Sequence, residues 1–136
     1  MRRGLKLEDV GDLLEYPLIA VLATIRADGG ILLSPVWQEW REGGFNLFSA
    51  AGDVKLRHLR ADPRATVVVF EAIPPYRGIE VRGTATLSTE HAVEIAERIA
   101  ARFEDPDPDE DPVPPDSVVI RLEPGTLRVW DYADEF

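Results

Sequence analysis

Short apolar runs separated by glycine-containing turns dominate the pattern of hydrophobic and polar positions along the chain. Runs rich in branched and aromatic residues predict β-strands at residues 18–27, 31–42, 45–50, 64–71 and 77–88. The segments "DGG" at 28–30 and "GG" at 43–44 supply turns between them. Near the C-terminus, "SVVIRLEP" and "TLRVWDY" are predicted to form a hairpin around Pro124 and Gly125. Pro35 cannot donate a ladder hydrogen bond, so it favours a sheet edge or a bulge.

Helical spacing of apolar residues is found in three other segments of the chain. Residues 7–16 predict a helix that Pro17 ends. Residues 53–61 predict a short helix with Asp53 as its N-cap and with Leu56 and Leu59 toward the core. The clearest helix is expected at 89–103, capped by Thr89. Mostly antiparallel strands with a few flanking helices predict a mainly β (α+β) fold, a small closed or split β-barrel without exposed sheet edges.

The length and the composition indicate one globular domain spanning residues 1–136. With 25 acidic and 15 basic residues, the formal net charge is −10. Such a charge argues against broad nucleic-acid binding and against docking on anionic lipid. The longest apolar run, at 17–25, is too short to span a bilayer, so a cytoplasmic location and no membrane association are expected.

Cysteine is absent from the chain, which excludes disulfides, thiolate metal sites and cysteine nucleophiles. The acid- and proline-rich residues 104–116 predict a solvated loop. Their aspartates have spacings like those of a calcium loop, but Glu110 stands where such a loop needs glycine. No metal site is therefore predicted.

The segment "GDVKLRHLR" at 52–60 concentrates basic residues in this acidic chain. On a helix, Lys55 and His58 share one face, and Lys55 lies near the helix start, where free N–H groups favour an anion. Ser49, at the end of the preceding strand, adds a hydroxyl donor. Two interpretations stay open: a solvated basic helix face and a phosphate site.

The order of motifs resembles a known superfamily. "VLATIRADGGILLSPVW", "FNLFSAAGDVKLRHLRADPRATVVV", "YRGIEVRGTATL" and "LRVWDY" are similar to the split-barrel flavin-binding proteins related to pyridoxamine-phosphate oxidase. The resemblance covers roughly residues 16–131 and is greatest to the branch that uses the deazaflavin coenzyme F-420. It implies a split β-barrel with flanking helices that works as a homodimer with two cofactor grooves.

The resemblance also implies roles for individual residues. Lys55 matches the family lysine that binds the cofactor phosphate, Ser49 lies near that phosphate, and His58 stands where many relatives have Asn. The ring is expected against the strand that carries Pro35, Val36 and Trp37, and Trp130 matches a tryptophan that reaches the cofactor from the other subunit. Arg77 and Arg82 are further candidates.

One departure from the family pattern lies directly before the lysine. Many relatives have Arg or Ser one or two positions before it, whereas this chain has Asp53 and Val54. Asp53 is a poor neighbour for a phosphate unless it serves as the helix cap. Arg57 or Arg60 would then have to supply the missing positive charge.

The resemblance implies an oxidoreductase that transfers a hydride between bound coenzyme F-420 and a small organic substrate. Two alternatives remain: an FMN-binding flavoprotein with oxidase or electron-transfer activity, and a non-catalytic carrier of a cofactor or tetrapyrrole. For Trp37 and Trp40 the competing interpretation is burial in the core or in a dimer interface. The catalytic residues are not identified by the sequence.

Overall fold

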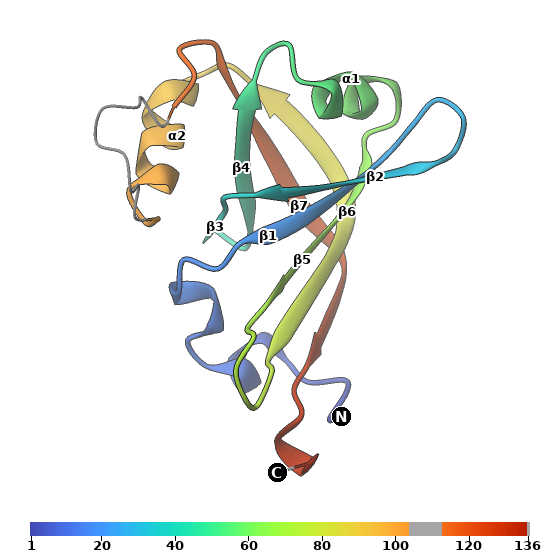
Figure 1. The fold of residues 1–136 in the computed structure, drawn as a ribbon, viewed down its shortest axis with the longest axis vertical. Coiled ribbons are helices and arrows are strands. Elements are labelled where there is room, and N and C mark those ends of the chain that lie inside the picture. Colours follow the sequence, from blue (N-terminus) through green and yellow to red (C-terminus); the bar gives the residue numbers. More distant parts are fainter. Residues whose placement is uncertain (104–112, 136) are drawn as a thin grey trace.

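A single curled antiparallel sheet organises the protein, whose computed structural model describes residues 1–103 and 113–135 (Figure 1). The strand order is β2-β1-β5-β6-β7-β4-β3. The strands are β1 (Ala20–Ile25), β2 (Ile31–Val36), β3 (Glu39–Arg41), β4 (Gly44–Ala50), β5 (Arg64–Phe70), β6 (Gly78–Ser88) and β7 (Ser117–Trp130). This half-barrel fits the predicted mainly β split-barrel fold. Strand β2, which carries Pro35, lies at a sheet edge, as predicted.

Strand β6 pairs along its whole length with residues 119–130 of β7, with one register shift between Arg82 and Gly83. A Cβ at Gly83 would overlap the carbonyl oxygen of Glu123, so only glycine allows this close approach. The predicted hairpin around Pro124 and Gly125 is therefore wrong. Both halves of residues 117–130 pair with β6, and Pro124 lies at the irregularity inside one continuous strand.

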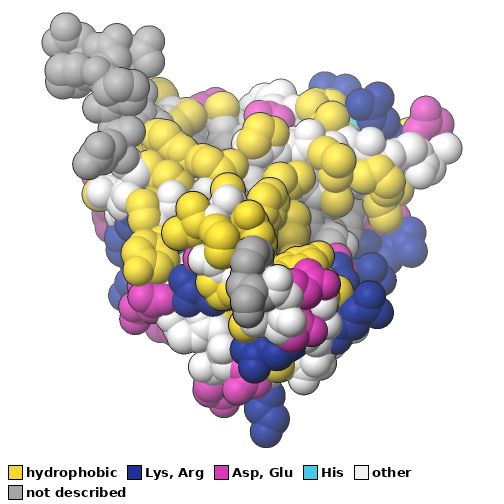
Figure 2. Space-filling view, turned by 60° about the horizontal axis from the view of Figure 1, so that its bottom comes forward, with side chains coloured by type: hydrophobic (Ala, Val, Ile, Leu, Met, Phe, Trp, Pro, Cys, Tyr) yellow, Lys and Arg dark blue, Asp and Glu magenta, His cyan; other side chains and the backbone are white. Residues whose placement is uncertain are grey.

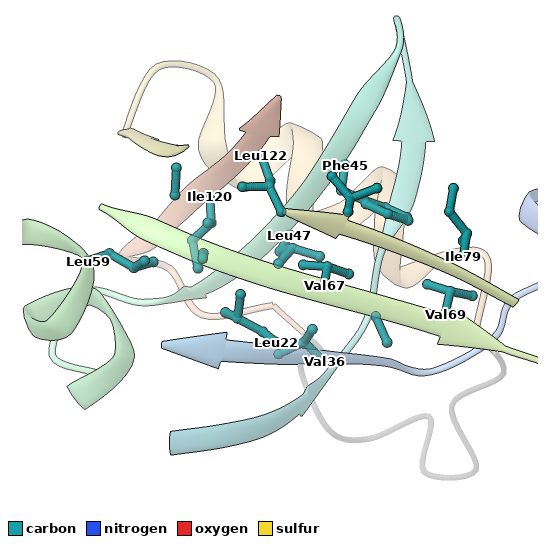
Figure 3. Close-up of a cluster of buried hydrophobic side chains, with 14 of the residues drawn as sticks. Leu22, Val36, Phe45, Leu47, Leu59, Val67, Val69, Ile79, Ile120 and Leu122 are labelled. Atoms are coloured by element: carbon teal, nitrogen blue, oxygen red, sulfur yellow. The ribbon is translucent and has the colours of Figure 1, made fainter. Parts of the chain in front are cut away.

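Alternating side chains of the strands fill the interior of the half-barrel. In β1, Ala20, Leu22 and Thr24 are fully buried, while the residues between them face outward. Figure 3 shows side chains from several strands and from α1 meeting in this core, including Leu22, Val36, Phe45, Leu47, Leu59, Val67, Val69, Ile79, Ile120 and Leu122. This packing supplies rigid support for the ends of β2 and β4 that lie nearest α1.

Two α-helices flank the sheet, α1 (Val54–Ala61) and α2 (Ala92–Ala100). Helix α1 is confirmed with its predicted cap, because the Asp53 side chain accepts a hydrogen bond from the backbone N–H of Lys55, and Leu56 and Leu59 are buried. Helix α2 is shorter than predicted. Its N-cap is His91, with φ of 53°, and Thr89 contributes only a backbone carbonyl, so the Thr89 cap is wrong.

Two further expectations need correction. The helix predicted at 7–16 is instead a pair of 3₁₀ helices, Leu7–Val10 and Leu13–Glu15, because Gly11 adopts a positive φ of 58° between them. The strand predicted at 31–42 is interrupted at Trp37 and Gln38, which lie between β2 and β3. Most of the predicted loop at 104–116 lies outside the described residues.

The chain ends meet at the end of the sheet opposite α1 (Figure 1). Arg2 forms a backbone bridge and an ion pair with Asp131, just before a last 3₁₀ helix at Ala133–Glu135. In the described parts of the chain, no helix has both the length and the apolar character needed to cross a bilayer.

Candidate functional site

A shallow pocket of about 310 Å³ lies where β2 ends and α1 begins. It brings together four of the residues that the sequence nominates: Pro35, Val36, Trp37 and Lys55. The remaining lining residues are apolar, namely Ile19, Phe48 and Pro114. The pocket thus combines one cation with apolar walls, a combination that suits a flat ring carrying an anionic group.

Trp37 forms a fixed wall of this pocket. Its ring stacks on Phe103 with centroids 5.1 Å apart and an interplanar angle of 9°, and it meets Phe48 edge-on at 6.3 Å. Behind these rings lie Ala96 and Ala100 of α2. Trp40 belongs to different surroundings, because it packs edge-on against Phe45 at 5.0 Å. Helix α2 therefore supports the pocket wall, although it lines none of the pocket itself.

Lys55 is the cation of the pocket, and it already has an anionic partner. Its side chain is only 13% exposed, and Nζ lies 2.8 Å from Oδ2 of Asp53. The same Nζ is 3.4 Å from Oγ of Ser49, a buried residue of β4. Burial alone would raise the pKa of Asp53, but hydrogen bonds from Lys55 and Ser49 leave that pKa below its ordinary value. Asp53 is therefore ionised at neutral pH.

Arg57 and His58 face a second hollow rather than the pocket of Lys55. This hollow of about 390 Å³ is lined by Ile25, Arg26, Ala27, Arg57, His58, Ala61 and Asp62. Nδ1 of His58 lies 3.0 Å from Oγ1 of the buried Thr24, which fixes the imidazole against β1. The structure thus places Lys55 and His58 in different pockets, although they are three residues apart on α1.

Arg77 lies in an ion network away from Lys55. Its guanidinium donates to both carboxylate oxygens of Glu71, to Oδ1 of Asp12 and to the carbonyl of Val10. The hydrogen bond from Arg77 lowers the pKa of the buried Glu71 carboxyl. These contacts tie the N-terminal segment to the loop between β5 and β6.

Arg82, the other candidate arginine, pairs with Glu80, which also binds Arg128. Both candidate arginines are thus engaged in ion pairs.

Trp130 lies far from the Lys55 of its own chain. It pairs with Gly78, whereas Ser49 beside Lys55 pairs with Val118, twelve residues earlier on the same strand. At roughly 3.3 Å per residue, the separation is about 40 Å along β7. The Arg128 guanidinium lies over the Trp130 ring, 4.7 Å from its centroid. In its own chain, Trp130 therefore does not complete the pocket.

Ile19, Phe48 and Pro114 were not expected in the pocket from the sequence. Phe48 could have been found, because it precedes Ser49 on a predicted strand and so leads to the same sheet end. Ile19 and Pro114 have no such signal, since only the folded sheet brings them together. Within residues 1–103 and 113–135, no three His, Asp or Glu side chains lie close enough to share a metal ion.

Comparisons with known proteins bear on the family and the fold of the chain. A family model described as pyridoxamine 5'-phosphate oxidase matches residues 7–131. No curated protein matches the chain. An F-420 reductase structure is 26% identical over 85% of this chain and 93% of its own, with a TM-score of 0.75.

Two other solved structures share the fold at lower identity. A conserved hypothetical protein from Mycobacterium tuberculosis is 24% identical, covering 96% of this chain and 88% of its own, with a TM-score of 0.79. An FAD-binding protein from Mesorhizobium loti is 19% identical, covering 94% of this chain and 95% of its own, with a TM-score of 0.69.

Proposed function

The chain belongs to the pyridoxamine 5'-phosphate oxidase family, and on that basis we propose that it transfers a hydride between coenzyme F-420 and a small organic substrate. The observation that carries the proposal is the pocket in which Lys55 stands beside the residues Pro35, Val36 and Trp37. The likeness to an F-420 reductase supports the deazaflavin over other cofactors of this fold.

The donor set of the pocket fits a cofactor with a flat ring and a phosphate. The ammonium of Lys55 and the hydroxyl of Ser49 lie 3.4 Å apart, so one phosphate can contact both. Trp37, held by Phe103 and Phe48, offers an apolar surface to a ring. When bound, the deazaflavin supplies the hydride-carrying centre.

The residues of the chain bind and orient in this proposal, and they do no acid–base chemistry. Lys55 and Ser49 hold the phosphate, and the backbone of Pro35 and Val36 holds the ring edge. The apolar side chains of Ile19, Phe48 and Trp37 offer the ring a surface that orients it in the shallow pocket. Arg57 and His58 line a separate hollow, and Arg77 holds the loop between β5 and β6 in place.

A homodimer is part of the proposal. Along β2, Ile31, Leu33 and Pro35 are exposed, and their register partners Ile25, Ala23 and Val21 face outward on β1. Figure 2 shows hydrophobic side chains spread over a broad area of one face of the molecule. An exposed apolar sheet face is typical of a subunit interface. A second copy could also bring its Trp130 to the pocket, which this chain's own Trp130 does not reach.

The experiment that tests the function follows the oxidation of reduced F-420 by absorbance while a panel of small unsaturated or carbonyl compounds is added. Substrate-dependent oxidation that disappears in Lys55→Ala supports the proposal. A purified protein that is yellow with bound FMN and inactive with F-420 would establish the flavoprotein alternative. Tight cofactor binding without oxidation by any compound would instead favour a carrier, and the proposed enzyme activity would be wrong.

A further inference from the structure

Both oxygens of the Asp53 carboxylate are used within the first turn of α1. Oδ1 accepts the backbone N–H of Lys55 at 3.1 Å, and Oδ2 lies 2.8 Å from Nζ of the same lysine. A helix start attracts a phosphate through its free N–H groups and through a nearby cation. Asp53 therefore binds the two groups of Lys55 that a phosphate at this position would use.

The charge of the pocket is balanced by this pair. Among the described lining residues, Lys55 is the one charged side chain, and the other walls are apolar. The nearest basic residues on α1, Arg57 and His58, face the second hollow. With Asp53 at its edge, the pocket has no net formal charge, so an incoming phosphate meets little electrostatic attraction.

The pair is also placed so that it can open. Asp53 is one-third exposed, with 33% of its side chain accessible, whereas Lys55 is only 13% exposed. The ammonium sits on a flexible four-carbon stem, which allows Nζ to turn from one anion to another. Because its pKa is lowered, Asp53 stays charged at neutral pH and competes with a ligand at all times.

We propose that Asp53 sets the affinity of the cofactor site: it holds Lys55 as an internal counterion, and the cofactor phosphate must draw Lys55 away from it. The inference rests on the proposed function. The return of Lys55 to Asp53 helps the phosphate to leave. The site therefore suits a cofactor that is exchanged as a cosubstrate after each turnover, and it disfavours a flavin that is retained permanently.

The test is a substitution that removes the charge and keeps the cap. Asp53→Asn preserves an N-cap acceptor, because Asn and Asp cap helices about equally well. Its dissociation constants for oxidised F-420 and for FMN, read by fluorescence titration, are expected to fall by about tenfold or more. Stopped-flow displacement is expected to show that most of the change lies in slower dissociation.

A matched control separates local from general charge effects. Asp62→Asn makes the same change of charge at the other end of α1, where Asp62 pairs with Arg64. It is expected to leave both dissociation constants within about twofold of the wild type. Asp53→Ser, a second variant with a capping side chain, keeps the test possible if Asp53→Asn folds poorly.

The outcomes distinguish this inference from the function on which it rests. If Lys55→Ala weakens binding while Asp53→Asn and Asp53→Ser bind no tighter than the wild type, the inference about Asp53 is wrong and the phosphate anchor stands. Equal tightening by Asp62→Asn would also overturn it, since the effect would then be one of net charge. If Lys55→Ala leaves affinity unchanged, both the anchor and the role of Asp53 are wrong.

Discussion

The indole ring of Trp130 lies directly across the backbone of Gly78 on the neighbouring strand. A Cβ at position 78 would stand 2.8 Å from Nε1 of the indole and would overlap its six-membered ring. The Arg128 guanidinium packs over the same indole, at 4.7 Å from its centroid, and binds Glu80 at 3.0 Å. Trp130 is thus held in one orientation at the end of the sheet that is remote from its own Lys55.

The first prediction follows from this contact. Gly78→Ala is expected to displace the indole and to lower the free energy of unfolding by about 1–3 kcal/mol, because no space exists for the added methyl group. Denaturant unfolding measures the loss. Gly52→Ala is the control, because a Cβ at Gly52 has no atom within 4 Å. Equal stability of the two variants would contradict the described packing of Trp130.

The second prediction concerns the ion network of Arg77. Arg77→Ala leaves the buried Glu71 carboxylate without its partner and is expected to cost about 3 kcal/mol of unfolding free energy. Arg64→Ala removes a comparable but exposed pair, in which Arg64 is 73% accessible, and is expected to cost less than about 1 kcal/mol. Chemical denaturation of both variants tests the difference. Similar losses of unfolding free energy in the two variants would contradict the larger stabilisation assigned to the Arg77 network.

Acid stability provides a third prediction. The hydrogen bond from Arg77 lowers the pKa of Glu71, and that from Arg2 lowers the pKa of Asp131. A lowered folded-state pKa means that the unfolded chain takes up the proton first as pH falls. The stabilisation is therefore complete at neutral pH and declines below about pH 4–5, near the pKa of an unfolded carboxyl.

The melting temperature between pH 7 and pH 3 measures this decline. The Glu71→Gln variant should show a shallower fall over the acidic range than the wild type. Glu90→Gln, at an exposed position, should follow the wild-type curve. A wild-type melting temperature that stays constant down to pH 3 would contradict the assigned ion pairs.

The fourth prediction concerns the proposed homodimer. Leu33 is 63% exposed at the centre of the outward face of β2, so Leu33→Glu should place a charge inside the interface and produce monomers. Light scattering after size-exclusion chromatography measures the mass. Val93→Glu, on the exposed side of α2, is the control and should not change the mass. A wild-type monomer at high concentration would disprove the proposed interface.

The parts of the fold that follow from local chemistry were predictable from the sequence. Asp53 caps α1 because a carboxylate before a helix accepts its free N–H groups, and the turn predicted at 28–30 joins β1 to β2. The turn predicted at 43–44 lies one residue earlier, at 42–43, because Gly44 already pairs with Arg41. The errors arise where the structure depends on pairing between strands that are far apart in the sequence. Pro124 looks like the corner of a hairpin, yet β6 pairs on both sides of it and keeps β7 continuous.

The candidate site could likewise be predicted only in part from the sequence. The sequence nominated Lys55 together with Pro35, Val36 and Trp37, and the fold brings these residues to one pocket. It could not show that Arg57 and His58 line a hollow separate from the pocket of Lys55, since that depends on how the helix is rotated against β1. Nor could it show that Asp53 pairs with the side chain of Lys55 as well as capping its helix.

The measurement that tests the central claim most directly is a fluorescence titration of wild type and Lys55→Ala with F-420 and with FMN. The wild type is expected to bind F-420, and Lys55→Ala is expected to lose affinity by about 30-fold or more, because it removes the one charged group among the described lining residues. Circular dichroism should show an unchanged fold, since among the described residues the ammonium of Lys55 bonds to Asp53 and Ser49 near the surface of α1 and contributes nothing to the core. Equal affinity of the two proteins for both cofactors would contradict the assignment of this pocket as the cofactor site.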